Sequence, residues 1–445
     1  MFDKKGLITR NFIFKIYSFL LIVILGVDLL LPSYLNFSAS TAISFPVTDG
    51  WCNAVTQGIG AHCFGDYYYA AQFANMSDPW AGSLYPYPPL AAAMFKPFVW
   101  ISSVSKNPRL GLLIYLLFII VAVAGTFRLM FKNSKEGTLN DWRMEKNAYI
   151  ALGAISAPVL IVFDRGNNTA LLFPLFWLYV KFWKDSNSLK SPFILLIMVL
   201  IKPQMILLGL LLIRNRKDVV NGLKFVVIAM LTFLASFLLY PKGLVKNVLD
   251  FAHQESVFQS HPSPGYLFPQ NLSLCNLVGL IARISGYRIT SSLAISGIEL
   301  LFLVIFTALY FAYKNRRQEN TNLLLITSMP LLIPAVCYSY YYVLLLIPLY
   351  YVFLESKYVS ELFYRKWWSV SFGLMLVFVF IPFAVPWRLF LRNHGSSAFL
   401  NSGIFSLLGQ IMFVFVSLIC LVVIPIMENS SSNTNRGKTT LKANI

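Results

Sequence analysis

The segment around Asp66 contains the residue types that a sugar-binding reaction site needs. Three tyrosines, residues 67–69, follow Asp66 directly, and a second aromatic segment, residues 80–90, lies a short way downstream. A carboxylate can take the proton of a hydroxyl group, and aromatic rings can stack on the faces of a sugar ring. The alternative is a solvated loop aspartate beside aromatic residues at a membrane surface, an arrangement that membrane proteins show routinely.

Two cations interrupt otherwise apolar stretches. Arg165 belongs to the polar turn 164–168 between two apolar runs, and Lys202 lies in the middle of the apolar segment 192–213. Ionisable residues at membrane depth are costly and therefore indicate function. An arginine fork and a lysine point charge suit a phosphate group held at the lipid interface. The alternatives are that Arg165 pairs with its neighbour Asp164 and that Lys202 reaches toward the membrane surface.

A third polar region is the segment 241–286. It contains Asp250, His253, Glu255 and His261, which are possible metal ligands. The helical HExxH spacing and cysteine pairs of known metal sites are absent, so we predict no metal here.

A run of aromatic residues from Tyr338 to Tyr342 is open to two interpretations. It is either part of the aromatic belt at a membrane surface or one wall of the sugar pocket. The belt is the more common use of such a run.

The composition identifies the setting in which these residues work. Of 445 residues, 57% are hydrophobic and 12% are charged, against about 25% charged in soluble domains. This excludes a soluble globular protein, a disordered chain and a disulfide scaffold. The net charge of +18 indicates basic cytoplasmic loops of a membrane protein rather than nucleic-acid binding.

Apolar runs of near-bilayer length predict about ten transmembrane helices. Lysine and arginine cluster after alternate runs, which places both chain ends in the cytoplasm and the loop that carries Asp66 outside. The predicted spans are 12–31, 110–127, 149–163, 169–182, 225–239, 292–313, 323–336, 341–354, 370–387 and 404–427.

Two further apolar segments do not fit as single spans, because counting either one would reverse the charge pattern. Segment 88–104 is rich in alanine and proline and is interpreted as an amphipathic helix along the outer interface. Segment 192–213 contains Lys202-Pro203 at its centre. It is interpreted as a bent hairpin of two short helices, which membranes tolerate where a broken helix lines a cavity.

The predicted fold is therefore an all-α polytopic membrane protein with one domain, residues 1–427. Its outer loops are 35–107, 241–289 and 388–403. The tail, residues 428–445, is rich in Ser, Asn, Thr and Lys, and we expect it to be disordered in the cytoplasm.

Five short motifs follow one another along the chain. They are Gly65 to Ala71, Tyr87 to Leu90, Arg165 to Asn168, Ile201 to Gln204 and Asn271 to Leu274. Their order resembles that of the family 87 glycosyltransferases of the GT-C superfamily, typified by polyprenol-phosphate-mannose-dependent alpha-mannosyltransferases. Each motif is short, but their order and their fit to the charge-derived topology make the resemblance specific.

Two departures from the family pattern matter. Asn167 stands where the family has glutamine, which is a mild change. Residues 334–339 lack the tryptophan and histidine that relatives commonly have ahead of a late span. If that histidine assists catalysis in relatives, its task here is absent or is taken by another residue such as His253.

The resemblance implies an inverting glycosyltransferase in the cytoplasmic membrane, with its active site facing outside. It would move a sugar, commonly mannose in this family, from a polyprenyl-phosphate donor to a lipid or glycan acceptor of the cell envelope. Asp66 would be the catalytic base, and Arg165, Lys202 and Arg388 would bind the donor phosphate, with Arg392 in reserve. No metal or other cofactor is expected. The residues expected to bind substrate are Tyr68, Tyr69, Tyr87, Asn168, His253 and Asn271.

A transporter or lipid flippase is the main alternative. Such proteins bind their substrates at broken helices near the membrane midplane, and the expected hairpin at Lys202 fits that description. The long aromatic outer loops favour the enzyme. A purely structural membrane scaffold is a third possibility, but it leaves Arg165 and Lys202 unexplained.

Overall fold

Besides a few short pieces near both ends of the chain, the computed structural model describes most of residues 64–80, 87–132, 153–183, 188–213, 218–260, 271–313 and 319–351. The spans predicted at 12–31, 370–387 and 404–427 fall almost wholly outside these ranges. So do the outer loop 388–403 and the tail 428–445. Within the described residues the fold is all helical, as predicted, and contains no strand.

Three helices in the described part are long and apolar enough to cross a membrane. They are α6 (Pro108–Lys132), α11 (Asp218–Ser236, continued by the 3₁₀ turn η3, Phe237–Leu239) and α14 (Ser292–Tyr313). Each contains a predicted span, and α14 coincides with the range predicted for it. The described residues therefore support a polytopic membrane protein, but they do not confirm about ten spans.

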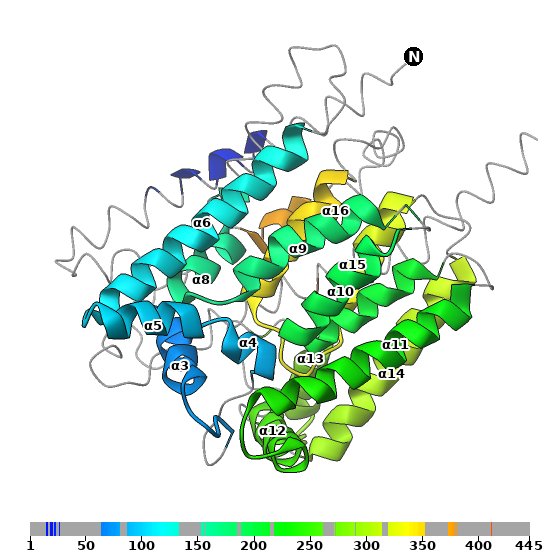
Figure 1. Ribbon diagram of the computed structural model, residues 1–445. Coiled ribbons are helices and arrows are strands. Elements are labelled where there is room, and N and C mark those ends of the chain that lie inside the picture. The colour runs from blue at the N-terminus through cyan, green and yellow to red at the C-terminus, as the bar shows by residue number, and fades with distance from the viewer. Residues whose placement is uncertain are drawn as a thin grey trace, which may run out of the picture.

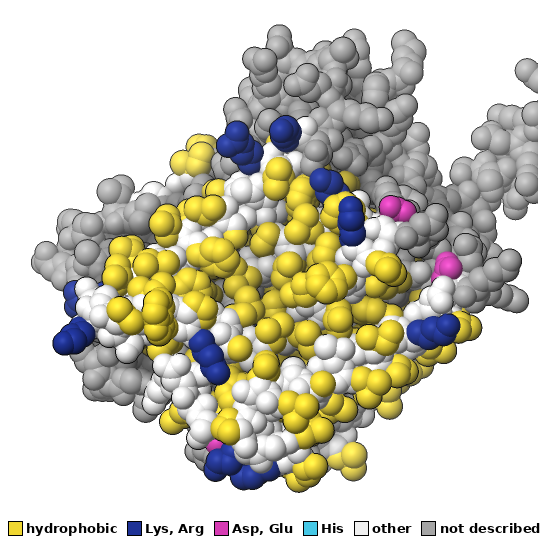
Figure 2. Space-filling view, in the orientation of Figure 1, with side chains coloured by type: hydrophobic (Ala, Val, Ile, Leu, Met, Phe, Trp, Pro, Cys, Tyr) yellow, Lys and Arg dark blue, Asp and Glu magenta, His cyan; other side chains and the backbone are white. Residues whose placement is uncertain are grey.

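One broad face of the molecule is apolar (Figure 2). In this view, hydrophobic side chains cover the centre, and most of the visible Lys and Arg side chains lie near the edges. On α11 the exposed side chains include Leu223, Val227 and Leu231. Apolar groups exposed over so wide an area indicate contact with lipid rather than water.

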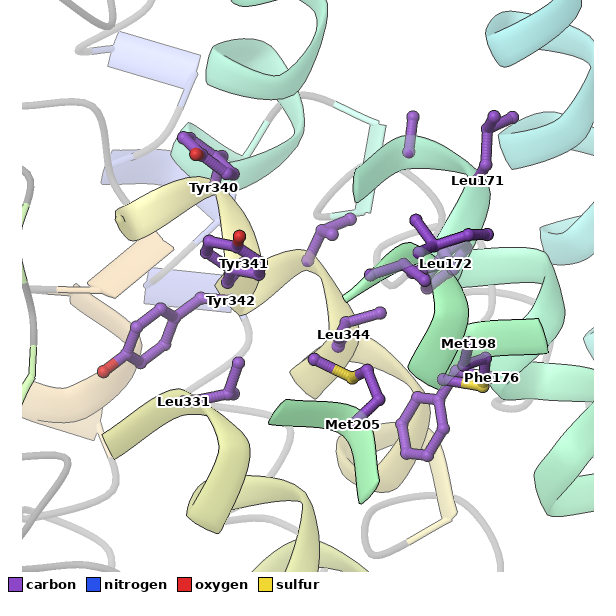
Figure 3. Packing of buried hydrophobic residues seen from close by; sticks show 14 of the residues in the cluster. Leu171, Leu172, Phe176, Met198, Met205, Leu331, Tyr340, Tyr341, Tyr342 and Leu344 are labelled. Carbon is purple, nitrogen blue, oxygen red and sulfur yellow. The ribbon is translucent and has the colours of Figure 1, made fainter. Parts of the chain in front are cut away.

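Shorter helices pack inside this frame (Figure 1). Most of their apolar side chains are buried, and Figure 3 shows Leu344 and Met205 among the residues of this core. Because these helices are too short to span a bilayer at 1.5 Å per residue, length alone does not show how they sit in the membrane. They are α8 (Ala157–Arg165), α9 (Thr169–Phe182), α10 (Lys190–Ile201), η2 (Pro203–Leu212), α15 (Glu319–Leu332), η5 (Ser339–Leu345) and α16 (Leu346–Tyr350).

The break predicted at Lys202-Pro203 is present. Helix α10 ends at Ile201, Lys202 is extended with φ −142° and ψ 103°, and the chain continues from Pro203 as the 3₁₀ helix η2. Proline disfavours the helical conformation in the residue before it, which explains why α10 stops here. Since α10 and η2 pack against each other, the hairpin interpretation is confirmed in its local geometry, while its depth in the membrane stays a prediction.

Segment 88–104 forms two short helices rather than one. These are α4 (Pro89–Ala93) and α5 (Lys96–Val104), and α5 packs against α6. Trp100 is 66% exposed and Val104 65% exposed, as expected for an apolar surface in contact with lipid. Its placement along the outer interface stays a prediction.

Three more helices lie toward one end of the bundle in Figure 1. They are α3 (Gly65–Ala74), α12 (Leu244–Ser260) and α13 (Leu274–Ile284). Helix α3 contacts α4, α5 and α8, while α12 contacts both α11 and α14. This end of the molecule therefore brings the Asp66 segment next to the polar turn after α8.

Candidate active site

The site is built around the corner between α8 and α9. Helix α8 ends at Arg165 because Gly166 takes the left-handed conformation, with φ +62°. Glycine adopts this conformation without a steric penalty. A Cβ atom on Gly166 would also lie 2.9 Å from the Cβ of Tyr67. The corner therefore needs glycine both for its backbone conformation and for its close contact with α3.

Asp66 lies in the first turn of α3, directly against this corner. The backbone N–H of Phe64 donates to the carbonyl of Asp164 at 2.5 Å, which fixes the start of α3 on the end of α8. Asp66 is 9% exposed. The partial positive charge at a helix N-terminus favours a carboxylate at this position.

Arg165 and Asn167 bind the Asp66 carboxylate together. The Nε of Arg165 donates to Oδ2 at 2.8 Å and its Nη2 donates to Oδ1 at 2.7 Å. The Nδ2 of Asn167 donates to Oδ2 at 2.6 Å. Asn167 is held in turn by Thr169, whose backbone N–H and hydroxyl donate to the amide oxygen at 2.9 and 2.7 Å. The structure thus joins the predicted base to a predicted phosphate ligand across 99 residues of chain.

Lys202 is the second buried cation, and its surroundings differ. Its ammonium group lies 4.7 Å from the centre of the Tyr87 ring and 5.3 Å from that of Tyr341. The residue is 8% exposed, and its ammonium group has no hydrogen bond and no ion pair with the described part of the chain. The charges of Asp66, Glu255 and Arg165 act on the Lys202 ammonium group. Lys202 therefore shares the electrostatic environment of the ion pair between Arg165 and Asp66.

An aromatic wall of Tyr338, Tyr340 and Tyr341 connects the two cations. The guanidinium carbon of Arg165 lies 5.3 Å from the Tyr338 ring centre and 5.4 Å from that of Tyr340. Neighbouring ring centres are 5.5 Å apart for Tyr338 and Tyr340 and 4.8 Å apart for Tyr340 and Tyr341. Figure 3 shows Tyr340 and Tyr341 projecting from η5 into the interior. Of the two interpretations of this run, the geometry therefore favours the pocket wall over an exposed belt.

Tyr87 connects the Lys202 side of the site to the Asp66 side. Its hydroxyl oxygen is 3.5 Å from the Nδ2 of Asn167, and its ring faces Lys202. The indole N–H of Trp80 donates to the Tyr87 carbonyl at 3.1 Å. Trp80 is fully buried, so the aromatic segment near residues 80–90 has a structural part and a part that faces the site.

Asn271 uses its amide to hold the loop that precedes the aromatic wall. Its oxygen accepts hydrogen bonds from the backbone N–H of Cys337 at 3.0 Å and of Ser273 at 3.2 Å, and its nitrogen donates to the Ala335 carbonyl at 3.2 Å. The residue is 3% exposed and pairs with Tyr338 as an isolated bridge. This geometry supports a positioning role for Asn271 rather than direct contact with substrate.

The remaining sequence-predicted residues lie in different places. Tyr68 and Tyr69 are half-buried on α3. Asn168 is fully buried at the start of α9, and neither its amide oxygen nor its amide nitrogen has a hydrogen-bond partner among the described residues. His253 is exposed on α12 and is not among the residues brought together here. Arg388, like Arg392, lies outside the described residues.

Two tyrosines near the site are neutral hydrogen-bonding groups. Burial raises the pKa of Tyr69 to about 12. Burial also raises the pKa of Tyr338 to about 12, against the opposing effect of Arg165. Both phenols are therefore protonated at neutral pH and able to donate hydrogen bonds. Among the described residues, no group of three or more His, Cys, Asp or Glu side chains is arranged to hold a metal ion.

The sequence did not identify Asn167 as part of the site, and it left the aromatic run 338–342 open between a membrane belt and a pocket wall. Asn167 was visible only as one residue of the polar turn, and its contact with Asp66 depends on how α3 docks on α8. The wall was recognised as an aromatic run without a location. In both cases the missing information is a contact between distant segments, which a single sequence does not show.

A comparison with protein-family models gives one match. The model described as glycosyltransferase family 87 matches residues 85–339, more than half of the chain. The matched segment contains Tyr87, Arg165, Lys202 and Asn271, whereas Asp66 lies before it. No curated protein matches this chain.

Proposed function

Because this chain belongs to glycosyltransferase family 87, and is therefore a glycosyltransferase, we propose that it takes its sugar from a polyprenyl-phosphate donor and inverts the anomeric centre. The observation that carries this proposal is the buried Lys202 ammonium group, which has no counter-ion among the described residues. The acceptor is a lipid or glycan of the cell envelope.

A donor phosphate supplies the negative charge that Lys202 lacks. Burying a cation is costly unless it is paired, and the two aromatic faces at 4.7 and 5.3 Å offset only part of that cost. Cation–π contacts contribute about 0.5–2 kcal/mol each. A monophosphate held by cations needs no metal to stabilise its charge as the sugar leaves.

Asp66 acts as the general base. An ionised carboxylate has roughly four lone-pair positions for hydrogen bonds, and Arg165 and Asn167 occupy three. The remaining position accepts the acceptor hydroxyl. The hydroxyl oxygen attacks the anomeric carbon, the bond from that carbon to the phosphate oxygen breaks, and the hydroxyl proton passes to Asp66. The electron pair of the broken bond stays on the phosphate, next to Lys202.

Arg165 has two tasks in this scheme. Its ion pair orients Asp66 but also favours the ionised form of the carboxylate, which makes Asp66 a weaker base. A guanidinium has five N–H donors, of which two bind Asp66. When the donor phosphate arrives, it competes for Arg165, and the basicity of Asp66 rises as the reaction begins.

The aromatic wall provides the sugar-binding surface. The rings of Tyr338, Tyr340 and Tyr341 extend from Arg165 to Lys202, where the donor sugar would lie beside its phosphate. Mannose is the proposed sugar because it is the common donor of the family. The outward orientation follows from the lysine and arginine clusters of the sequence, which place the Asp66 loop outside.

A membrane assay with labelled polyprenyl-phosphate mannose tests the base. Asp66→Asn keeps the shape of the side chain but removes its basicity, and we expect kcat to fall roughly 10²- to 10⁴-fold. The control is Asp250→Asn, which changes a partly buried carboxylate on α12 paired with Lys246, and it should leave the rate unchanged. Full activity of Asp66→Asn would refute the assignment.

A further inference from the structure

A groove opens where α11, α12 and α14 meet. It has a volume of about 400 Å³, within the range of small-molecule sites. Most of its wall is apolar, and its polar groups come from α12 and from the first turns of α14. The residues that define it are Phe233, Phe237, Phe251, Glu255, Ser292 and Ser296.

We propose that this groove binds the acceptor, and that the acceptor is a lipid with an uncharged, hydroxyl-bearing head. The hydrocarbon chain packs on the phenylalanine side chains, and hydroxyl groups of the head hydrogen-bond to Glu255 and the serines. Binding of a lipid in this groove does not depend on the proposed function. Only the identification of that lipid as the acceptor rests on it.

The position of the groove gives access from the membrane. Helices α11 and α14 are two of the three described helices that are long and apolar enough to cross a bilayer. The groove lies at the end of α11 and the beginning of α14, where both contact α12. A lipid is therefore able to enter from the side, with its head at the level of the membrane surface and its chain still among apolar groups.

The charges in the groove distinguish an acceptor from the donor. Among the described residues that line it, Glu255 is the only charged one. A carboxylate repels a phosphate, but it accepts hydrogen bonds from sugar or glycerol hydroxyls. The donor phosphate is expected at Lys202, so the two lipids would have separate places of opposite charge.

One face of α12 connects the groove to the aromatic wall. Glu255 and Phe258 are three residues apart and so share a helix face. The ring centre of Phe258 is 6.5 Å from that of Tyr338, which in turn is 5.3 Å from the Arg165 guanidinium carbon. Glu255 also acts electrostatically on Lys202 and Tyr341. A lipid head at Glu255 is therefore next to the residues that would hold the donor.

Photolabelling tests this site without requiring enzyme activity. The full-length protein in phosphatidylcholine nanodiscs is irradiated with dodecyl glucoside that carries a diazirine in its chain, and the labelled peptides are mapped by mass spectrometry. We expect labelling of residues 233–237 and 248–252, and competition by excess unlabelled dodecyl glucoside. Dodecyl phosphate with the same diazirine should label these residues less, and Glu255→Gln should reduce this difference.

A matched pair of variants tests the groove itself. Ser296→Trp fills it, and we expect roughly tenfold weaker labelling because the chain loses several buried methylene groups. Ala294→Trp places the same bulk two positions away. Residues two apart do not share a helix face, so this side chain points away from the groove and should not change labelling. Absence of groove labelling by the glucoside, stronger labelling by the phosphate, or equal labelling of both variants would overturn the proposal. None of these outcomes bears on Asp66 or Lys202, so the proposed transfer reaction is tested separately.

Discussion

The two buried cations, Arg165 and Lys202, are alike in burial and in their contacts with tyrosine rings but differ in their counter-ions. Each is 8% exposed and each lies about 5 Å from two tyrosine rings. Arg165 has the carboxylate of Asp66 as a bidentate counter-ion, whereas Lys202 has none in the described residues. A buried charge that the protein itself neutralises belongs to the architecture, and one that it leaves unneutralised is suited to a ligand of opposite charge. The comparison therefore supports the proposal that Arg165 mainly orients Asp66 and that Lys202 mainly binds the donor.

Replacing each cation by methionine should give opposite effects on stability, and this is the largest effect that we expect. Arg165→Met leaves the Asp66 carboxylate buried without its partner, a loss of about 3–5 kcal/mol. Lys202→Met removes an unneutralised charge and should leave the protein equally stable or more stable. Thermal unfolding of the full-length protein in detergent, without lipid substrate, measures both. If Lys202→Met unfolded at a lower temperature than Arg165→Met, the comparison would be wrong.

Gly166→Ala should disturb only the part of the site that contains Arg165 and Asp66. A left-handed conformation costs an L-residue about 1–2 kcal/mol, and the new methyl group would press on Tyr67 at 2.9 Å. We expect a lower unfolding temperature and a lower kcat, with the KM for the donor little changed because the Lys202 side is intact. Gly243→Ala is the control, since it has the same sign of φ but nothing within 4 Å of the added Cβ. A large rise in donor KM for Gly166→Ala alone would show that the two sides are not separable.

Tyr87→Leu should instead affect the part of the site around Lys202, where the donor is proposed to bind. The ring face 4.7 Å from the ammonium group contributes about 0.5–2 kcal/mol. We expect the KM for the donor to change severalfold, while Tyr87→Phe keeps the ring and should resemble the wild type. Steady-state rates with varied donor distinguish these outcomes. If phenylalanine were as harmful as leucine, the hydroxyl group rather than the ring would be the part that matters.

Asn167→Gln should have the smallest effect. Glutamine stands at this position in the family pattern that the sequence resembles, and its longer amide is able to reach Asp66 by a different rotamer. We expect less than about 1 kcal/mol of lost stability, the value of one ordinary hydrogen bond, and a kcat close to that of the wild type. Asn167→Leu leaves Oδ2 of Asp66 short of one donor and should be clearly slower. Equal rates for the two variants would show that this hydrogen bond is unimportant.

The sequence predicted those features that depend on local chemistry. The helix break at Lys202 follows from Pro203, and the corner after Arg165 follows from Gly166 and the polar residues around it. The residue types at Asp66, Arg165 and Lys202 were unusual enough in an apolar chain to be selected as site candidates. These conclusions need only neighbouring residues and the cost of burying charge.

Other features depend on packing between distant segments and were not predictable. The sequence did not show that Arg165 would bind Asp66, because 99 residues separate them. It also did not show that the amide of Asn271 faces backbone groups rather than substrate, since asparagine suits either role. The number of membrane spans was also not predictable from the sequence. Helix α9, with 14 residues, is apolar on all sides, and such a pattern fits a short buried helix as well as a crossing one.

The most direct test of the central claim is the binding of undecaprenyl phosphate, compared with that of undecaprenol, to the wild type and to Lys202→Met in nanodiscs. We expect the wild type to prefer the phosphate and Lys202→Met to lose most of this preference, by roughly 10- to 100-fold, because a charge-assisted contact is worth about 1.5–3 kcal/mol. Undecaprenol should bind both proteins equally. An unchanged preference for the phosphate in Lys202→Met would contradict the account, because the donor phosphate would then be held by other residues.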